Sequence, residues 1–324
     1  MSDVLRIDRA SARCEHMLLT RPYTIATGSY DAVSNVLVEL YADGLVGRGI
    51  ASPEPNVTGE TVEMSARTVE DFAWLVGQRL DLPALLVQLK RRMPNAPAAR
   101  AAVDIALYDL WAQGQGKPLV EALGRAHHTL PTSVTIGIKD LGETLVETDE
   151  YLGRGFCAIK VKLGLDLAQD LERLRRVRLR CGPKTALRVD PNQGYSREEL
   201  LYFADATAEL DLELIEEPLL TSASLSDLPD ALRAKLAADE SLLNEEDAQR
   251  LAGPPAQCGI FNVKLMKCGG IGPALSIAAT AQNAGIHLMW GCMDEGVIGI
   301  AAALHAALAC AQTRYLDLDG SLDL

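Results

Sequence analysis

The chain has 324 residues, of which 48% are hydrophobic and 23% are charged, and its formal net charge is −13. A globular protein of this size forms two domains or one barrel with an appendage, and no apolar run here approaches the roughly 20 residues that span a bilayer. An acidic chain without basic clusters is a poor candidate for binding nucleic acid. The N-terminus has no signal-peptide pattern, and the seven cysteines form no Cys-x-x-Cys pair, so we expect a cytoplasmic protein with reduced thiols.

The first part of the chain predicts a small α+β domain, which we place at residues 1–125. Short apolar segments separated by turn residues are typical of strands, and apolar residues at helical spacing between 102 and 111 predict a helix. The expected elements are strands at 18–24, 36–40 and 47–50, a loop at 26–29, and helices at about 58–80 and 98–114. Antiparallel strands followed by helices favour an α+β domain.

Residues 126–324 predict a parallel β/α barrel. Short apolar strands alternate there with amphipathic helices, such as 166–181 and 274–284, and this rhythm is typical of a parallel sheet covered by helices. The eight expected strands are 133–138, 158–163, 186–189, 212–215, 236–238, 260–265, 287–290 and 315–318. A doubly wound open sheet is the alternative, but no Gly-x-Gly-x-x-Gly follows a first strand.

Two lysines stand on the second expected barrel strand, in the sequence Ala-Ile-Lys-Val-Lys-Leu at 158–163. Alternate side chains of a strand share a face, so Lys160 and Lys162 should point to the same side. Mutual repulsion and poor solvation both depress the pKa of a lysine, and a lysine with a depressed pKa can act as a base near neutral pH. We therefore expect a catalytic role for this pair instead of a packing role.

Carboxylates end three consecutive expected strands: Asp190, Glu216 and Asp239. The C-terminal ends of barrel strands form the active-site face, so these side chains should converge. Converging carboxylates repel one another unless a cation lies among them, and an all-oxygen site suits Mg²⁺ better than Zn²⁺. The competing interpretation is that each carboxylate caps the helix after its strand. Three carboxylates in register favour the metal site.

A further lysine, Lys264, lies on the sixth expected strand. Strands two and six are four steps apart in an eight-stranded barrel, so Lys162 and Lys264 should face each other across it. Two opposed lysines can remove a proton from one face of a carbon and return one to the other face, and a metal would stabilise the enolate between the two steps. A Schiff base is the alternative role for such a lysine, although it leaves the three acidic strand ends unexplained.

The ordered set of motifs resembles the enolase superfamily, in its muconate-lactonizing subgroup. The matching segments are AVDIALYDL at 102–110, KVK at 160–162, DPN at 190–192, EEP at 216–218, DES at 239–241, and Lys264 with KCGG at 267–270. The resemblance implies a modified TIM barrel of the (β/α)7β type behind an N-terminal α+β capping domain. It also implies Asp190, Glu216 and Asp239 as Mg²⁺ ligands, Lys162 and Lys264 as the acid/base pair, Lys160 as an electrostatic modulator of Lys162, and Glu240 as a supporting residue.

The end of the chain distinguishes activities within that subgroup, which includes cycloisomerases, o-succinylbenzoate synthases, N-succinylamino acid racemases and dipeptide epimerases. Asp317 and Asp319 lie on one face at the mouth of the last expected strand and suit a substrate ammonium. This Asp-x-Asp, like the segment WGCMDE at 290–295, is similar to the dipeptide-epimerase pattern, whereas a lone Asp-x-Asp would be interpreted as a loop or capping contact. We therefore expect Mg²⁺-dependent epimerisation of the C-terminal residue of a dipeptide.

The expected specificity elements are two loops of the capping domain and the loop after the seventh strand. Ala-Glu epimerases often carry an arginine in the early loop, where this chain has Gly28, whereas Glu54 and Asp294 make the rim acidic. An acidic rim favours cationic side chains, so we expect dipeptides that contain Lys or Arg, with Thr135 as a further substrate contact. The alternative treats Glu54 and Asp294 as solvated surface charges.

Other activities stay open from the sequence. An N-succinylamino acid racemase or o-succinylbenzoate synthase is the alternative within the subgroup, and a Schiff-base aldolase or a non-catalytic dipeptide binder is the alternative outside it. A homo-oligomer is compatible with the sequence. Family members usually continue beyond the last barrel strand with a tail that returns to the capping domain, so we expect either that such a tail follows Leu324 or that this protein lacks it.

Overall fold

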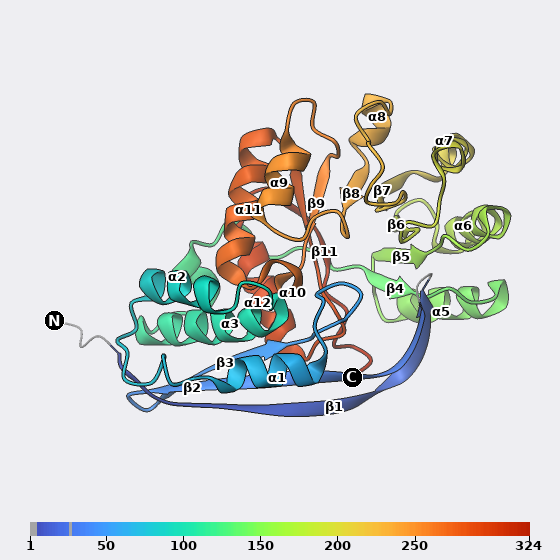
Figure 1. Ribbon diagram of the computed structural model, residues 1–324. Coiled ribbons are helices and arrows are strands. Elements are labelled where there is room, and N and C mark those ends of the chain that lie inside the picture. Colours follow the sequence, from blue (N-terminus) through green and yellow to red (C-terminus); the bar gives the residue numbers. More distant parts are fainter. Residues whose placement is uncertain (1–4, 26–27) are drawn as a thin grey trace.

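Two sheets organise the chain in the computed structural model, which describes residues 5–25 and 28–324. A three-stranded antiparallel sheet comes first, and an eight-stranded parallel sheet with helices outside it follows (Figure 1). The expected barrel behind an α+β capping region is therefore confirmed. Ala26 and Thr27, at the tip of the expected early loop, lie outside the described residues.

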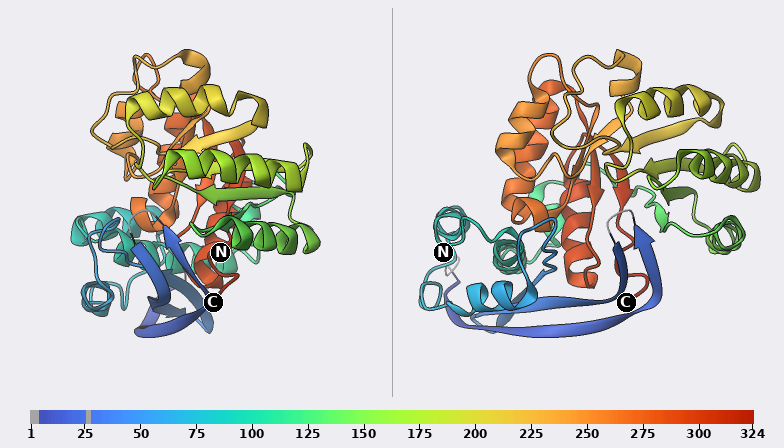
Figure 2. Two further views of the ribbon diagram at one scale, coloured as in Figure 1. Left: turned by 90° about the vertical axis from the view of Figure 1, so that its right-hand side faces the viewer. Right: turned by 45° about the vertical axis from the view of Figure 1, so that its right-hand side comes forward.

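The antiparallel sheet is a long hairpin with a third strand on one edge. Its strands, in spatial order, are β1 (Ile7–Ile25), β2 (Gly28–Ala42) and β3 (Leu45–Ala51). The hairpin runs below the barrel and curves up beside α5 (Leu141–Gly153), as Figures 1 and 2 show. The strand predicted at 18–24 was too short, because the first half of β1 carries many polar side chains and is held by pairing with the apolar β2.

Four helices complete the capping region: α1 (Val62–Glu70), α2 (Leu82–Arg92), α3 (Pro97–Gly114) and α4 (Leu119–Leu123). The helix predicted at 98–114 is confirmed as α3. The helix predicted at about 58–80 is wrong, because only α1 forms in that interval. Gly59 has a φ of 73°, which breaks helical geometry, and Thr61 caps α1 by accepting a hydrogen bond from the backbone of Met64.

Helix α3 joins the capping sheet to the barrel. Most of its side chains are buried, and it packs against β3 on one side and against α10 (Leu265–Cys268) on another. Gly49 on β3 allows the close approach, since a Cβ there would lie 1.8 Å from the carbonyl oxygen of Ala102. The capping region is thus attached to the barrel through a tightly packed helix.

The parallel sheet follows chain order from β4 to β11. Its strands are β4 (Val134–Ile136), β5 (Ala158–Lys162), β6 (Ala186–Asp190), β7 (Leu212–Glu216), β8 (Leu236–Ala238), β9 (Ile260–Val263), β10 (His287–Gly291) and β11 (Thr313–Asp317). The helices around it, besides α5 and α10, are α6 (Leu167–Cys181), α7 (Arg197–Ala206), the 3₁₀ turn η1 (Ala208–Leu210), α8 (Asp230–Arg233), α9 (Glu245–Ala252), α11 (Ile271–Ala284) and α12 (Val297–Ala309). An isolated parallel bridge between Thr132 and Leu316 joins the two edges. The doubly wound alternative is wrong, because the strand order never reverses.

Two further expectations concern the whole chain. All seven cysteines are free thiols, as predicted. Among the helices of the described residues, none combines the length and the apolar character needed to cross a membrane.

Candidate active site

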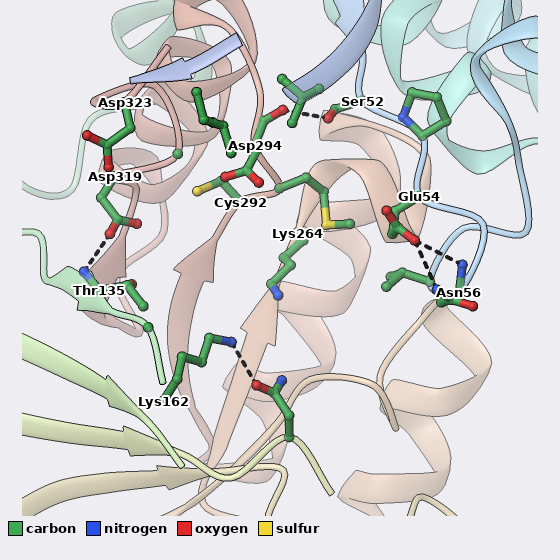
Figure 3. A pocket seen from close by; sticks show the side chains of 18 of the residues that line it. Ser52, Glu54, Asn56, Thr135, Lys162, Lys264, Cys292, Asp294, Asp319 and Asp323 are labelled. Atoms are coloured by element: carbon green, nitrogen blue, oxygen red, sulfur yellow. Dashed lines mark hydrogen bonds between the residues drawn. The ribbon is translucent and has the colours of Figure 1, made fainter. Parts of the chain in front are cut away.

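A cavity of about 460 Å³ opens at the C-terminal ends of the barrel strands, beneath the loop after β3 and the capping hairpin (Figure 3). The predicted site residues that line it are Glu54, Thr135, Lys160, Lys162, Asp239, Glu240, Lys264, Asp294, Asp317 and Asp319. Asp190 and Glu216 are fully buried behind Lys160, which contacts both. The fold thus brings all the predicted site residues into one region.

Lys160 is the centre of a buried ion cluster. Its Nζ lies 2.6 Å from Glu216, 2.8 Å from Asp317 and 3.1 Å from Asp190, and the residue is 2% exposed. Burial lowers the pKa of Lys160, but the three carboxylates outweigh it and hold the pKa well above its ordinary value. The expectation that the two strand lysines depress each other's pKa is therefore wrong for Lys160, because carboxylates dominate its surroundings.

Lys162 and Lys264 converge on the cavity from opposite walls (Figure 3). Lys162 ends β5, whereas Lys264 immediately follows β9, which ends at Val263 and is shorter than the predicted strand 260–265. The two strands are four places apart in the sheet of eight, as predicted. Lys162 Nζ donates to Asp190 at 2.6 Å and to Asn192 Oδ1 at 3.0 Å, and Lys264 Nζ donates to Asp239 at 2.7 Å. Burial lowers the pKa of Lys264, but the adjacent carboxylates, Asp239 first, raise it above its ordinary value. Each ammonium is therefore held beside a predicted metal-binding carboxylate.

The three strand-end carboxylates are buried together. β6 ends at Asp190, β7 ends at Glu216, and Asp239 follows β8; none is more than 3% exposed. Burial raises the pKa of all three carboxyls. Lysine ammonium groups outweigh it at Asp190 and Asp239, whose pKa values lie below the ordinary range, whereas burial and the neighbouring Asp190 raise the pKa of Glu216 to about 8.

These carboxylates fit a divalent cation in donor type and burial. Within 5–25 and 28–324, no three Asp, Glu, His or Cys side chains stand in coordinating geometry, since lysine ammonium groups lie among the carboxylates. Glu216 Oε2 lies 2.6 Å from Lys160 Nζ but makes no well-aligned hydrogen bond to any described residue. A buried set of oxygen donors with an unsatisfied oxygen suits Mg²⁺.

Asn192 and Glu240 line the floor of the cavity, and Lys267 is buried behind Asp239; of the three, only Glu240 was a predicted site residue. Asn192 donates to Glu240 Oε1 at 3.2 Å, while Glu240 Oε2 has no hydrogen-bond partner among the described residues. Burial and Asp239 raise the pKa of Glu240 to about 7. Lys267 donates to the carboxylate and the carbonyl of Asp239. Asn192 and Lys267 belong to the quoted DPN and KCGG motifs, which was the available signal.

The two aspartates at the end of β11 have different surroundings. Asp317 accepts a hydrogen bond from Ser133 Oγ at 2.5 Å and pairs with Lys160; burial raises its pKa, but Lys160 outweighs burial and lowers it to about 2. Asp319 accepts from the backbone N–H of Thr135 at 2.6 Å, and burial together with Asp317 raises its pKa to about 7. Both aspartates line the cavity, but Asp317 is paired with a lysine, whereas Asp319 is held by the backbone N–H of Thr135 (Figure 3).

Acidic side chains form the rim of the cavity. Glu54 lies in the loop after β3, where its Oε1 accepts from the backbone and side-chain nitrogens of Asn56 at 3.3 and 3.2 Å. Asp294 lies between β10 and α12 and also lines the cavity. Glu63 and Asp323 join them there, although nothing in the local sequence marks either residue. The rim therefore carries more carboxylates than the sequence predicted, together with Arg21 and Lys139, which are both paired with Glu147.

Glu295 is a buried acid beside this rim. It is 1% exposed, its Oε1 accepts from the backbone of Met293 at 3.2 Å, and its Oε2 has no partner among the described residues. Burial raises its pKa from 4.5 to about 8. The unfolded chain releases this proton near pH 4.5, but the folded protein holds it to about pH 8. The stabilising contribution is therefore fully present below about pH 4.5, decreases as the pH rises from there, and is lost completely above about pH 8.

We expect Glu295→Gln to remove this pH dependence, because glutamine resembles the neutral acid. The free energy of unfolding of the wild type should fall by about 1.4 kcal/mol per pH unit relative to the variant between about pH 5 and 8. Urea unfolding at several pH values measures the difference, with the exposed Glu209→Gln as a control that keeps the wild-type slope. Parallel slopes for the wild type and Glu295→Gln would refute this assignment.

Comparison with known proteins gives matches along the whole chain. The family model described as mandelate racemase / muconate lactonizing enzyme, N-terminal domain, matches residues 9–124, and the model described as enolase C-terminal domain-like matches residues 143–323. An L-Lys-D/L-Arg epimerase of Methylococcus capsulatus is 56% identical over 99% of this chain and 92% of its own length. An L-Lys-D/L-Arg epimerase of Desulforapulum autotrophicum is 49% identical over 96% of this chain and 89% of its own length.

A solved structure resembles this fold closely. The crystal structure of the dipeptide epimerase from Methylococcus capsulatus, complexed with Mg and the dipeptide L-Arg-D-Lys, has a TM-score of 0.97 and 55% sequence identity to this chain. The match covers 98% of this chain and 92% of the other. The similarity therefore extends over both the capping region and the barrel.

Proposed function

The chain belongs to the mandelate racemase/muconate lactonizing enzyme family of the enolase superfamily, and we propose that it is a Mg²⁺-dependent dipeptide epimerase, an isomerase that prefers dipeptides containing Lys or Arg. The residue inverted is the C-terminal one. The observation that carries the proposal is the convergence of Lys162 and Lys264 from opposite walls on one cavity. A reaction that moves a proton at both faces of one atom needs two acid/base groups in that arrangement.

The opposed lysines perform the two proton transfers. A neutral lysine amine takes the α-proton from one face of the substrate, and the electron pair of the broken C–H bond stays on the substrate. The ammonium of the opposite lysine donates a proton to the other face, where the new C–H bond forms with that electron pair. The configuration is inverted and no proton is gained or lost.

Asp190, Glu216 and Asp239 would hold Mg²⁺, because they supply buried carboxylate oxygens from three neighbouring strand ends. When bound, Mg²⁺ would neutralise the substrate carboxylate, acidify the adjacent C–H bond and draw the charge of the three carboxylates away from the lysines. Glu240 supports the floor through Asn192.

Asp319 and Asp317 would anchor the N-terminal ammonium of the dipeptide by charge-assisted hydrogen bonds. Asp319 faces the cavity and is oriented by the backbone N–H of Thr135. Asp317 lies at the end of β11, lines the cavity and pairs with Lys160, and it would supply the second carboxylate of the anchor. This anchor would place the α-carbon of the second residue between the two lysines.

The acidic rim supports a cationic side chain on the substrate. Glu54, Glu63, Asp294 and Asp323 all line the cavity. Two basic side chains, Arg21 and Lys139, line it as well, but both are paired with Glu147, so the acidic side chains should still attract a cation. The relatives with 56% and 49% identity act on a Lys-Arg dipeptide by name. We therefore assign the side-chain preference to this rim.

The alternative activities fit the site less well. N-succinylamino acids and o-succinylbenzoate precursors have no α-ammonium, and their succinyl carboxylate would meet Asp317 and Asp319. A Schiff-base aldolase uses one lysine as a nucleophile and leaves its opposed partner without a role. A non-catalytic dipeptide binder has no use for two opposed lysines.

A dipeptide screen tests the proposal. The purified protein with Mg²⁺ in D₂O should incorporate deuterium at the α-carbon of the C-terminal residue, with kcat/KM for Lys- and Arg-containing dipeptides at least about tenfold above that for Ala-Glu. Equal or better turnover of Ala-Glu would refute the cationic preference. Absence of exchange with every dipeptide would refute the epimerase.

A variant that removes one carboxylate from the rim tests whether the rim selects cationic side chains. Glu54→Gln should raise KM for Lys- and Arg-containing dipeptides by about tenfold and leave uncharged dipeptides nearly unchanged. Glu70→Gln, on the exposed end of α1, is the matched control and should behave as the wild type. A uniform change of KM across all dipeptides would show that Glu54 shapes the loop and does not select charge.

The proposal extends to the organisation of the protein. We place the boundary between the capping and barrel domains near residue 125, and we assign the enzyme to the cytoplasm, which is consistent with seven free thiols. We also propose a homo-oligomer that does not bind nucleic acid, in keeping with the formal net charge of −13.

A further inference from the structure

Two buried charges on α3 hold the turn that follows Lys264. Asp104 is 1% exposed; its Oδ1 accepts from the backbone N–H of Ile271 at 2.6 Å, and its Oδ2 accepts from that of Gly272 at 3.4 Å. Arg100 is 8% exposed and donates through Nη2 to the carbonyl of Cys268 at 2.9 Å. Asp104 belongs to the AVDIALYDL motif, for which no chemical role was predicted, and it caps the start of α11 from the capping region.

The glycine pair in this turn is shaped to the same two side chains. Gly269 has a φ of 94° and Gly270 a φ of 117°, both in the region that favours glycine. A Cβ on Gly269 would lie 2.2 Å from Arg100 Nε, and one on Gly270 would lie 2.3 Å from the carboxyl carbon of Asp104. The positive φ angles and the close approach of Arg100 and Asp104 thus both require glycine at these two positions. The turn is therefore packed directly against α3.

The turn is continuous with one wall of the active site. Lys264 immediately precedes α10, and its carbonyl accepts from the backbone nitrogens of Lys267 and Cys268 at 3.1 and 3.2 Å. Lys267 also donates to the carbonyl of Asn262 on β9 at 3.2 Å. A shift of this turn against α3 (Figure 1) would therefore move the backbone of Lys264. Lys162 stands four strands away on the opposite wall.

We propose that Asp104, supported by Arg100, is a positioning residue for Lys264. Proton transfer by Lys264 at one face of the substrate then depends on α3, whereas proton transfer by Lys162 at the other face does not. The inference rests on the two-lysine function proposed above. Loss of the Asp104 contacts should therefore impair the two lysines unequally. A residue that served only general stability would impair both alike.

Isotope exchange without inversion separates the two faces. In D₂O a lysine that removes an α-proton can return solvent deuterium to the same face, so exchange of each epimer reports the lysine on its side. Lys162→Ala and Lys264→Ala assign the two epimers of Lys-Arg to the two lysines. In Asp104→Asn, exchange of the epimer assigned to Lys264 should fall at least about tenfold, while exchange of the other changes less than about twofold.

Two further variants complete the test. Asp109→Asn alters a carboxylate on the same helix that accepts from the backbone of Arg48 at 2.9 Å, and it should keep both exchange rates. Arg100→Lys keeps the buried positive charge but replaces the two guanidinium nitrogens that donate separately to the carbonyls of Met93 and Cys268 with a single ammonium, so it should weaken this contact. It should show the same asymmetry, and it tests the proposal if Asp104→Asn does not fold.

Equal effects on both epimers, or no effect, in a folded variant overturn the positioning role. Failure of both Asp104→Asn and Arg100→Lys to fold also overturns it, because the two residues then serve stability alone. Absence of exchange in the wild type overturns the proposed function instead.

Discussion

Replacing Lys264 or Lys162 with alanine should abolish epimerisation, with kcat lower by at least about 10³-fold in each case. Inversion needs one group to take a proton and an opposed group to supply one, and these two side chains converge on the cavity from opposite walls (Figure 3). Proton NMR in D₂O measures both inversion and exchange on the same sample. Each variant should keep exchange for one epimer only, because one lysine remains.

The matched control is another barrel lysine at the opposite end of the strands. Lys235 precedes β8, and its Nζ donates to the carbonyl of Leu212 at 3.1 Å. Lys235→Ala should therefore retain wild-type kcat and KM. A Lys264→Ala enzyme that still inverts its substrate would contradict the two-lysine scheme.

Removing Mg²⁺ with a chelator should stop turnover, and adding it back should restore turnover. Asp239→Asn should lower kcat by at least about 10³-fold, because it removes one of three buried carboxylates at the proposed metal site. Binding to the native state alone should also stabilise the wild type, by about 2.7 kcal/mol at a free metal concentration of about 100 times Kd. Thermal unfolding with increasing Mg²⁺ measures this effect without reference to activity.

The same titration provides the control. Asp247 on α9 pairs with Arg250 outside the cavity, so Asp247→Asn should keep the full Mg²⁺-dependent stabilisation. Asp239→Asn should lose most of it. Turnover in the presence of excess chelator, or an unchanged Mg²⁺ response in Asp239→Asn, would contradict the assignment of the metal ligands.

The sequence predicted the barrel well because its signals are local. Most of the strands are short, largely apolar runs that end at or just before a charged residue, and alternation along β5 sufficed to place Lys160 and Lys162 on one face. The capping region was predicted less well. Gly59 and Thr61 delay the start of α1, which ends at Glu70, so the helix predicted at about 58–80 was too long. The first half of β1 was missed because strand pairing, and not its own apolar pattern, holds it.

Sequence by itself determined which reacting group ends which barrel strand, and therefore that two lysines face each other above three carboxylates. Strand alternation and the order of strands around a barrel follow from neighbouring residues and from chain order. Only the tertiary structure decided which charges neutralise one another. Lys160 is paired with Asp317, 157 positions away, and Asp104 caps α11 at Ile271, 167 positions away. Coulomb energies and hydrogen bonds depend on distance in space and not on separation along the chain. No local pattern could therefore reveal that carboxylates surround Lys160, or that side chains of α3 hydrogen-bond to the turn after Lys264.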